Sequence, residues 1–272
     1  MKLDKNQPIG VFDSGIGGLT VANAISKLLP HEQIIYFGDT AHLPYGDKST
    51  RAIKQYSYMI TDFLIEKKCK AVVIACNTAS SIAYSFLQEL YKNEVHIIDV
   101  IQPVITGVCQ DRSIKKIAII GTQGTINSGV YENRFKAQNP DLEIFSLATP
   151  LLVPMIEAGN FNDAMSQAIL KSYLDRAEFK EADAIILGCT HYPLIKKDIL
   201  KVLDRDVKVF DNTDFVPREV DLELRRLYLL SDKKAGNDEF FVSDYTDTFE
   251  KTTRVFYGEK IHLELCNIWK SN

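Results

Sequence analysis

The sequence lacks the features that mark membrane, secreted or nucleic-acid-binding proteins. No apolar run approaches the roughly 18 residues of a membrane span, and the N-terminal segment has no stretch long enough for a signal peptide. No block of like charges occurs, and 32 Lys+Arg against 36 Asp+Glu give a net charge of −4. We therefore expect a cytoplasmic protein with a small-molecule partner, and neither a nucleic-acid surface nor a membrane patch.

The cysteines are few and show no pairing pattern. Five occur, none in a C-x-x-C motif, and an odd number fits reduced thiols better than a disulfide framework. A zinc site needs about four ligands, and Cys189 with His191 and one distant cysteine falls short. A Cys–His nucleophile stays open as an alternative. We expect Cys69, Cys109 and Cys266 to be small buried hydrophobic residues.

What the sequence does contain is a regular alternation of β-rich and helical segments. Most of the apolar runs lack period-2 alternation, which is typical of strands buried on both faces in a parallel sheet. These runs are 8–12, 33–39, 70–76, 94–100, 115–121, 143–148, 182–189 and 207–212. Helical stripes follow at 21–29 and 53–64, and the chain ends with a helix at 214–230 and a strand, helix and strand within 239–265. This order predicts an open α/β fold that binds ligands at the carboxyl ends of its strands.

A weak internal repeat divides this alternation into two units. "IGVFDSGIG" from Ile9 resembles "IAIIGTQGT" from Ile117, and "KAVVIACNTAS" resembles "ADAIILGCTHYP". The second pair of strings places Cys76 and Cys189 at the same point of the two units. We therefore predict two pseudo-symmetric, mainly parallel α/β lobes, with the thiols on opposite sides of the cleft between them.

The loop after the first expected strand, "DSGIGGLTV", carries Gly15, Gly17 and Gly18. Glycines at this place let the backbone approach a ligand while the N–H groups of the next helix face it. The dinucleotide fingerprint G-x-G-x-x-G fails, because Thr20 occupies the position of the third glycine. A polar small molecule is therefore favoured over a nicotinamide nucleotide.

Side chains that could hold such a molecule follow the first two strands. Asp13 and Ser14 supply a carboxylate and a hydroxyl, although either could simply cap the next helix. Asp39 could mimic the acidic ribose ligand of dinucleotide-binding proteins or begin a turn. The turn "LPYGDKS" offers the N–H of Gly46, together with Tyr45, to a carboxylate.

Cys76 and Cys189 each end a strand just before a helix, where the helix N-terminus favours a thiolate. Lowering the pKa of a thiol from about 8.5 to near 7 takes roughly 2 kcal/mol, whereas a helix terminus supplies only about 0.3 to 1 kcal/mol. Neighbouring groups must therefore contribute. An imidazolium at His191 favours a thiolate at Cys189, whereas a carboxylate at Asp13 favours a thiol. We predict opposite protonation states for the two cysteines.

Four motifs in this order and spacing, "GVFDSGIGGLTV", "YFGDTAHLPYG", "ACNTAS" and "GCTHYPL", resemble those of the glutamate racemases, cofactor-independent amino-acid racemases. The similarity extends over nearly the whole chain and includes "VPMIEAG", "DNTDFVPREV" and "FFVSDYTDTFEKTTRVFYG". The resemblance implies a first lobe of residues 1–98 with 211–272, a second lobe of 99–210, and an active site between them. It also implies a homodimer that uses no cofactor or metal.

The resemblance further implies roles for individual residues. Cys76 and Cys189 match the two acid/base cysteines, the first for the proton of D-glutamate and the second for that of L-glutamate, with Asp13 and His191 assisting. The implied substrate contacts are Asp13, Ser14, Tyr45, Gly46, Asn77, Thr78, Thr190 and His191, with Thr122, Thr125 and Glu157 as further contacts. The implied task is to supply D-glutamate for peptidoglycan.

Other functions stay open at this stage. A racemase for another acidic amino acid such as aspartate, or a cysteine-dependent decarboxylase of the same superfamily, would carry similar motifs. His191 favours glutamate, because related aspartate racemases resemble "GCTE" at this place. A non-catalytic protein that binds an amino acid between two lobes is a third reading, but it gives no reason for a thiol at the same point of both lobes.

Overall fold

The computed structural model describes residues 3–159 and 163–269. Its strands are β1 (Ile9–Asp13), β2 (Ile34–Gly38), β3 (Ala71–Ile74), β4 (His96–Asp99), β5 (Lys116–Gly121), β6 (Glu143–Ala148), β7 (Ala184–Gly188), β8 (Lys208–Asp211), β9 (Glu239–Val242) and β10 (Glu264–Leu265). Each apolar run named above coincides with one of the first eight strands, and only β1 extends beyond its run, by Asp13. The expected strand, helix and strand near the end of the chain are also present.

The helices lie between the strands, as the alternation predicts. They are α1 (Leu19–Leu28), α2 (Thr50–Glu66), α3 (Asn77–Leu90), α4 (Ile101–Cys109), α5 (Gln123–Asn127), α6 (Val130–Gln138), α7 (Leu152–Glu157), α8 (Ala164–Leu174), α9 (Ala177–Glu181), α10 (Lys196–Leu203), α11 (Asn212–Arg226) and α12 (Asp247–Tyr257), with short 3₁₀ turns η1 (Tyr45–Asp47) and η2 (Tyr192–Ile195). Within residues 3–159 and 163–269, no helix is long and apolar enough to cross a membrane.

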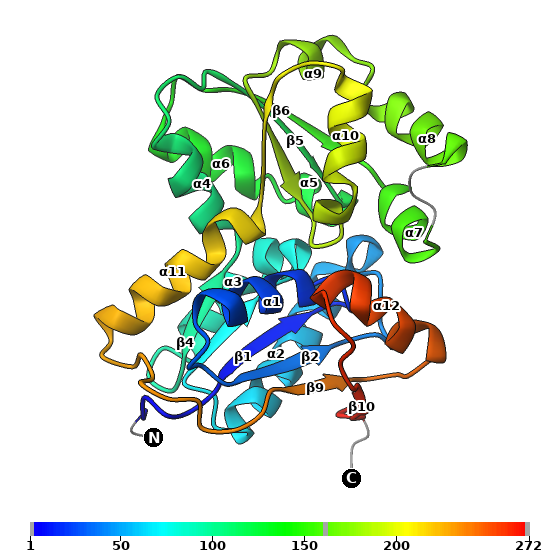
Figure 1. Cartoon of the computed structure of the whole chain (residues 1–272). Coiled ribbons are helices and arrows are strands. Elements are labelled where there is room, and N and C mark those ends of the chain that lie inside the picture. Colours follow the sequence, from blue (N-terminus) through cyan, green and yellow to red (C-terminus); the bar gives the residue numbers. More distant parts are fainter. Residues whose placement is uncertain (1–2, 160–162, 270–272) are drawn as a thin grey trace.

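The strands form two parallel sheets, one in each of two lobes (Figure 1). The first sheet has the order β10-β9-β2-β1-β3-β4 and the second has β6-β5-β7-β8. Without β9 and β10, the first sheet repeats the connectivity of the second, because β1, β2, β3 and β4 correspond to β5, β6, β7 and β8. The predicted pair of pseudo-symmetric α/β lobes is therefore confirmed.

Both faces of the first sheet are covered, which explains why its strands show no period-2 alternation. Successive side chains of a strand point to opposite faces. Ile9 and Val11 of β1 belong to the core that includes residues of α1, α11 and α12, whereas Phe12 belongs to the core that includes residues of α2 and α3. All five residues of β1 are buried. A strand of this kind reads as a continuous apolar run.

The end of the chain adds to the first sheet, since β9 pairs with β2 and β10 pairs with β9. The chain therefore passes between the sheets twice, once between β4 and β5 and once between β8 and β9. Helix α11 follows β8 directly and packs against α1 and α4. We keep the division of the lobes at 98/99 and 210/211 as our proposal.

Candidate active site

The pocket that holds the two cysteines lies between the lobes, at the carboxyl ends of both sheets. It contains about 390 Å³ of space not filled by atoms, part of it open to solvent. Of the residues predicted for the site, those that line it are Ser14, Tyr45, Gly46, Cys76, Asn77, Thr78, Thr122, Glu157, Cys189, Thr190 and His191. Asp13 and Thr125 lie behind this lining. Leu43, Pro44 and Val153 also line the pocket, and sequence analysis did not single them out.

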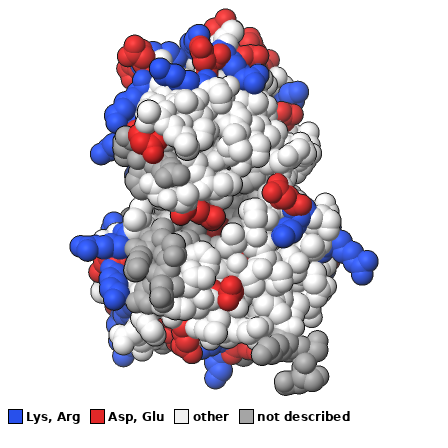
Figure 2. All heavy atoms as spheres, turned by 90° about the vertical axis from the view of Figure 1, so that its right-hand side faces the viewer, with Lys and Arg blue, Asp and Glu red and all other residues white. Residues whose placement is uncertain are grey.

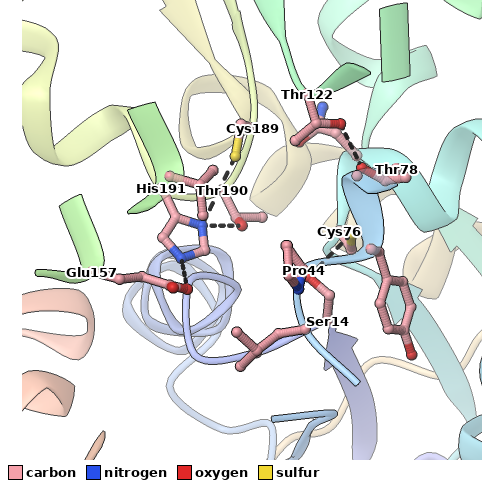
Figure 3. Close-up of a pocket in the computed structure, with 15 residues that line it drawn as sticks. Ser14, Pro44, Cys76, Thr78, Thr122, Glu157, Cys189, Thr190 and His191 are labelled. Atoms are coloured by element: carbon pink, nitrogen blue, oxygen red, sulfur yellow. Dashed lines mark hydrogen bonds and ion pairs between the residues drawn. The ribbon is translucent and has the colours of Figure 1, made fainter. Parts of the chain in front are cut away.

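The outside of the molecule agrees with a site between the lobes. Figure 2 shows the side that carries α7, where most of the surface is uncharged and the outline narrows between the upper and the lower lobe. In the close-up of Figure 3, Cys189 with Thr190 and His191 lies on one side of the pocket, and Cys76 with Ser14 lies on the other. Each lobe therefore presents one thiol to the same space.

Cys76 lies between the end of β3 and the start of α3, where its sulfur acts as the helix N-cap. The Sγ atom accepts a hydrogen bond from the N–H of Ala79 at 3.4 Å and lies 3.7 Å from Oγ of Ser14. Burial raises the pKa of the Cys76 thiol to about 12, and the nearby carboxylate of Asp13 acts in the same direction. This surrounding favours a neutral thiol at Cys76.

Asp13 ends β1 and is completely buried beneath the pocket. Its Oδ2 accepts hydrogen bonds from the N–H groups of Gly15 at 3.1 Å and Gly18 at 3.0 Å, so it also caps the turn that begins α1. Burial raises the pKa of the Asp13 carboxyl, whereas His191 and these backbone donors oppose the rise. The other oxygen, Oδ1, lies 3.4 Å from the hydroxyl of Thr190 in the second lobe.

Cys189 follows β7 at the position that corresponds to Cys76 after β3. Its Sγ lies 3.8 Å from Nδ1 of His191, whose Nε2 lies 3.0 Å from Oε1 of Glu157 on α7 (Figure 3). Burial alone would lower the pKa of His191, but its contacts with Cys189 and Glu157 outweigh this and raise the pKa to about 10. His191 is therefore a cation at neutral pH, held between a sulfur and a carboxylate.

Three threonine hydroxyls meet where α3 and α5 begin. Oγ1 of Thr78 lies 2.8 Å from Oγ1 of Thr122 and 3.2 Å from Oγ1 of Thr125. Thr122 also accepts a hydrogen bond from the N–H of Thr125, as the N-cap of α5. The predicted contacts Thr78, Thr122 and Thr125 thus form one cluster that joins the lobes and offers hydroxyl donors to a polar ligand.

Tyr45 lines the pocket, but its hydroxyl is directed elsewhere. It donates to Oδ2 of Asp39 at 2.7 Å, and Asp39 also binds Oγ of Ser243 at 2.7 Å and Nδ1 of His42 at 2.9 Å. Asp39 therefore fixes the loop that carries Tyr45 and Gly46, and this role was missed because Ser243 lies far away in the sequence. A ligand carboxylate here would meet Gly46 and the ring of Tyr45.

The glycine expectation is correct for Gly15, which lines the pocket, and wrong for Gly17 and Gly18. A Cβ atom on Gly17 would lie 2.5 Å from Nδ1 of His191, and one on Gly18 would lie 2.5 Å from Cβ of Asp13. These two glycines make room for site residues, one of them in the other lobe, and not for a ligand. The sequence could not show this, because the contact with His191 depends on how the lobes meet.

Asn77 begins α3 and lines the pocket with a buried side-chain amide. The amide is bound to Tyr131 of α6 and to Asn212, the first residue of α11. Neither partner was expected to belong to the site, and the only trace of Asn212 in the sequence is its place in the "DNTDFVPREV" motif.

Comparisons of the sequence with known proteins give one family. The model of the family described as Asp/Glu/Hydantoin racemase matches residues 18–219. The chain is 39% identical over 256 residues to glutamate racemase 2 of Caldanaerobacter subterraneus, covering 94% of this chain and 95% of that protein. It is 39% identical over 254 residues to the glutamate racemase of Geobacter metallireducens, covering 93% of each.

Among solved structures, those of racemases also resemble this one. A crystal structure of glutamate racemase from Francisella tularensis in complex with D-glutamate superposes with a TM-score of 0.91 at 38% identity, covering 97% of this chain and 99% of that one. An aspartate racemase from Picrophilus torridus superposes with a TM-score of 0.55 at 16% identity, covering 92% of this chain and 99% of that one, which shows the shared fold alone.

Proposed function

This chain belongs to the Asp/Glu/hydantoin racemase family, and on that premise we propose that it is a glutamate racemase, which interconverts L-glutamate and D-glutamate. The observation that carries the proposal is the pair Cys76 and Cys189, one from each lobe on the lining of one pocket. Racemisation removes the α-proton from one face of the substrate and returns a proton to the other, so it needs an acid and a base on opposite sides.

We assign the base for L-glutamate to Cys189 and the base for D-glutamate to Cys76. With L-glutamate bound, the Cys189 thiolate takes the α-proton and the Cys76 thiol gives its proton to the opposite face, which yields D-glutamate. Cys189 is then a thiol and Cys76 a thiolate, so the reverse reaction runs with the roles exchanged. The cation at His191 beside Cys189 and the burial of Cys76 support this starting state.

The negative charge that develops when the α-carbon loses its proton must be stabilised. Donors already oriented around the reacting centre supply this stabilisation. We propose that the hydroxyls of Ser14, Thr78 and Thr190 and the N–H groups at the start of α3 and at Gly46 bind the carboxylates and the amino group. The pocket lining and the cluster of threonine hydroxyls support this assignment.

The decisive experiment uses purified protein without any added cofactor. The circular dichroism of D-glutamate should decay to zero, and in D2O both enantiomers should gain deuterium at Cα. The same assay with aspartate should show slower turnover, because this chain has His191 where related aspartate racemases resemble "GCTE". Absence of both decay and exchange with glutamate would overturn the proposal, and faster turnover of aspartate would reassign the substrate.

We propose in addition that the enzyme acts as a homodimer in the cytoplasm and supplies D-glutamate for peptidoglycan. All five cysteines are free thiols, which fits a reducing compartment. Light scattering coupled to gel filtration measures the oligomeric state, and a monomer at micromolar concentration would contradict the dimer.

A further inference from the structure

Helix α6 belongs to the second lobe. One of its faces is connected by hydrogen bonds to the first lobe and to the two segments where the chain passes between the sheets, after β4 and after β8. Tyr131 and Arg134 lie three residues apart on α6, so they project from the same side of the helix. Asn212 begins α11 directly after β8, and Asp99 ends β4 shortly before α4. These are the two points from which the chain leaves one sheet for the other.

Tyr131 is connected to Asn212, at the start of α11, through the side chain of Asn77. The hydroxyl oxygen of Tyr131 accepts a hydrogen bond from Nδ2 of Asn77 at 2.8 Å, and Oδ1 of Asn77 accepts one from Nδ2 of Asn212 at 2.7 Å. All three residues are at most 2% exposed. Asn77 directly follows Cys76, so this network connects the second lobe to the segment that carries one of the reacting thiols.

Arg134 binds Asp99, at the end of β4, directly. Its Nη1 donates to Oδ2 of Asp99 at 2.5 Å, and its guanidinium lies over the ring of Tyr84 on α3, 5.4 Å from the ring centre. The carboxylate of Asp99 is completely buried, and its other oxygen caps α4 through the N–H groups of Ile101 and Gln102. Asp99 is the last residue of β4 in the first sheet, so moving α6 away from that sheet would leave a buried carboxylate without its cation, which is costly.

We propose that Tyr131 and Arg134 are positioning residues that hold the two lobes at the angle at which Cys76 and Cys189 reach opposite faces of one α-carbon. The proposal rests on the proposed function, and neither residue lines the pocket. A thiol on each lobe is useful only while the lobes keep this relation, because a displacement of about 1 Å can cost about 10²-fold in rate. Helix α6 fixes the relation because it binds the crossing at Asp99 directly and the crossing at Asn212 through Asn77.

The test is the variant Tyr131→Phe, which removes the hydroxyl that accepts the 2.8 Å hydrogen bond from Nδ2 of Asn77. The ratio of open to closed lobes should rise about fivefold, which corresponds to a loss of about 1 kcal/mol. KM for both enantiomers should rise by at most fivefold, while kcat at saturation falls less, because bound substrate closes the lobes again. Iodoacetamide should alkylate Cys76 and Cys189 about fivefold faster, and saturating D-glutamate should abolish that increase.

Two controls separate lobe positioning from general loss of stability. Cys69 lies in the core of the first lobe at 2% exposure, so its alkylation should stay unchanged in Tyr131→Phe. Tyr91→Phe removes the hydroxyl of a buried tyrosine whose partner, Asp62, lies in the same lobe, and it should leave KM unchanged.

Arg134→Lys is a second test variant. It keeps the charge but loses the planar contact with Asp99 and Tyr84, and it should act like Tyr131→Phe.

Wild-type values of KM and alkylation in both Tyr131→Phe and Arg134→Lys would overturn the proposal. A parallel rise at Cys69 would also overturn it, since it would show that the first lobe loosens as a whole. If the wild-type protein fails to racemise glutamate, the proposed function fails, while the alkylation rates still test the positioning role.

Discussion

The hydroxyl of Thr190 lies across the cleft from the carboxylate of Asp13, with 3.4 Å between Oγ1 and Oδ1. Thr190 follows Cys189 in the chain, and Asp13 is the charge that acts most strongly on Cys76. The surroundings of the two thiols are therefore in contact. A change in protonation beside one thiol therefore changes the pKa of groups beside the other. The charge of His191, for example, lowers the pKa of Asp13.

Replacing either cysteine should separate proton exchange from racemisation. Cys76→Ala and Cys189→Ala should each lower the racemisation rate by about 10² to 10⁴, the usual contribution of an acid or base. In D2O, Cys76→Ala should still exchange the α-proton of L-glutamate, and Cys189→Ala that of D-glutamate, as proton NMR can follow. Cys266→Ala, outside the pocket, serves as the control. Exchange of the same enantiomer in both variants would contradict the assigned roles.

The thiol of Cys76 should titrate far above the ordinary range. Its pKa is raised to about 12 by burial and then by Asp13, so its alkylation rate should keep rising beyond pH 10. Asp13→Asn removes the second cause and should move the midpoint to lower pH, whereas Asp141→Asn on the surface should not. Mass spectrometry of the alkylated peptides gives the profile of each cysteine. Identical profiles for Cys76 and Cys189 would contradict the predicted difference in their resting protonation.

The ion pair between His191 and Glu157 should make stability depend on pH. Because the pKa of His191 rises to about 10 in the folded state, the stabilisation from its charged form is fully present below its unfolded pKa and is lost as the pH approaches 10. Glu157→Gln should cost about 1.5 kcal/mol at pH 6, the lower end for a charged hydrogen bond, since the Glu157 side chain is 27% exposed.

Urea unfolding at several pH values measures this contribution. The difference between wild type and Glu157→Gln should shrink between pH 6.5 and 10, because His191 loses its proton in both proteins. The control is Glu181→Gln, which removes an exposed partner of Lys116 and should change stability much less than Glu157→Gln does at pH 6. A constant difference for Glu157→Gln across this range would contradict the assigned charge on His191.

Gly17→Ala should disturb the site, although Gly17 itself does not line the pocket. The new methyl group would lie 2.5 Å from the His191 ring and 2.7 Å from Oγ1 of Thr190, so the lobes or the imidazole must shift. A shift of about 1 Å predicts a loss of about 10² in kcat/KM. Gly236→Ala, which meets only the end of the Gln33 side chain, is the matched control. Unchanged kinetics for Gly17→Ala would mean that the lobes meet less tightly than described.

The strands, their parallel arrangement and the paired cysteines could all be predicted from the sequence. The central strands β1, β2, β3, β5 and β7 are apolar runs buried almost throughout, and burial on both faces is a local pattern that the sequence records. Cys76 and Cys189 could be recognised as a pair because each ends such a run just before a helix. The family resemblance implied Glu157 and Thr122, although nothing local in their segments shows where they would lie.

What the sequence could not show depends on contacts between distant segments. Asp39 binds Ser243 about two hundred positions later, and Asn77 meets Tyr131 and Asn212 only because two lobes and a chain crossing come together. Gly17 looked like part of a ligand loop because the local pattern is the same whether a ligand or an imidazole fills the space beside it. Interfaces between lobes leave no periodicity along the chain.

The repeated strand order gives the two thiols matching backbone positions, but evolution has given them unlike neighbours. Under the proposed roles, each conversion of L-glutamate carries one proton from Cys76 to the product and one from the substrate to Cys189. The enzyme therefore leaves every turnover in the inverted form and must return a proton before it can accept L-glutamate again. Since mirror-image molecules have equal free energy, the net direction is set by whichever reaction consumes D-glutamate. The rate of repeated turnover depends on how fast Cys76 regains a proton and Cys189 loses one.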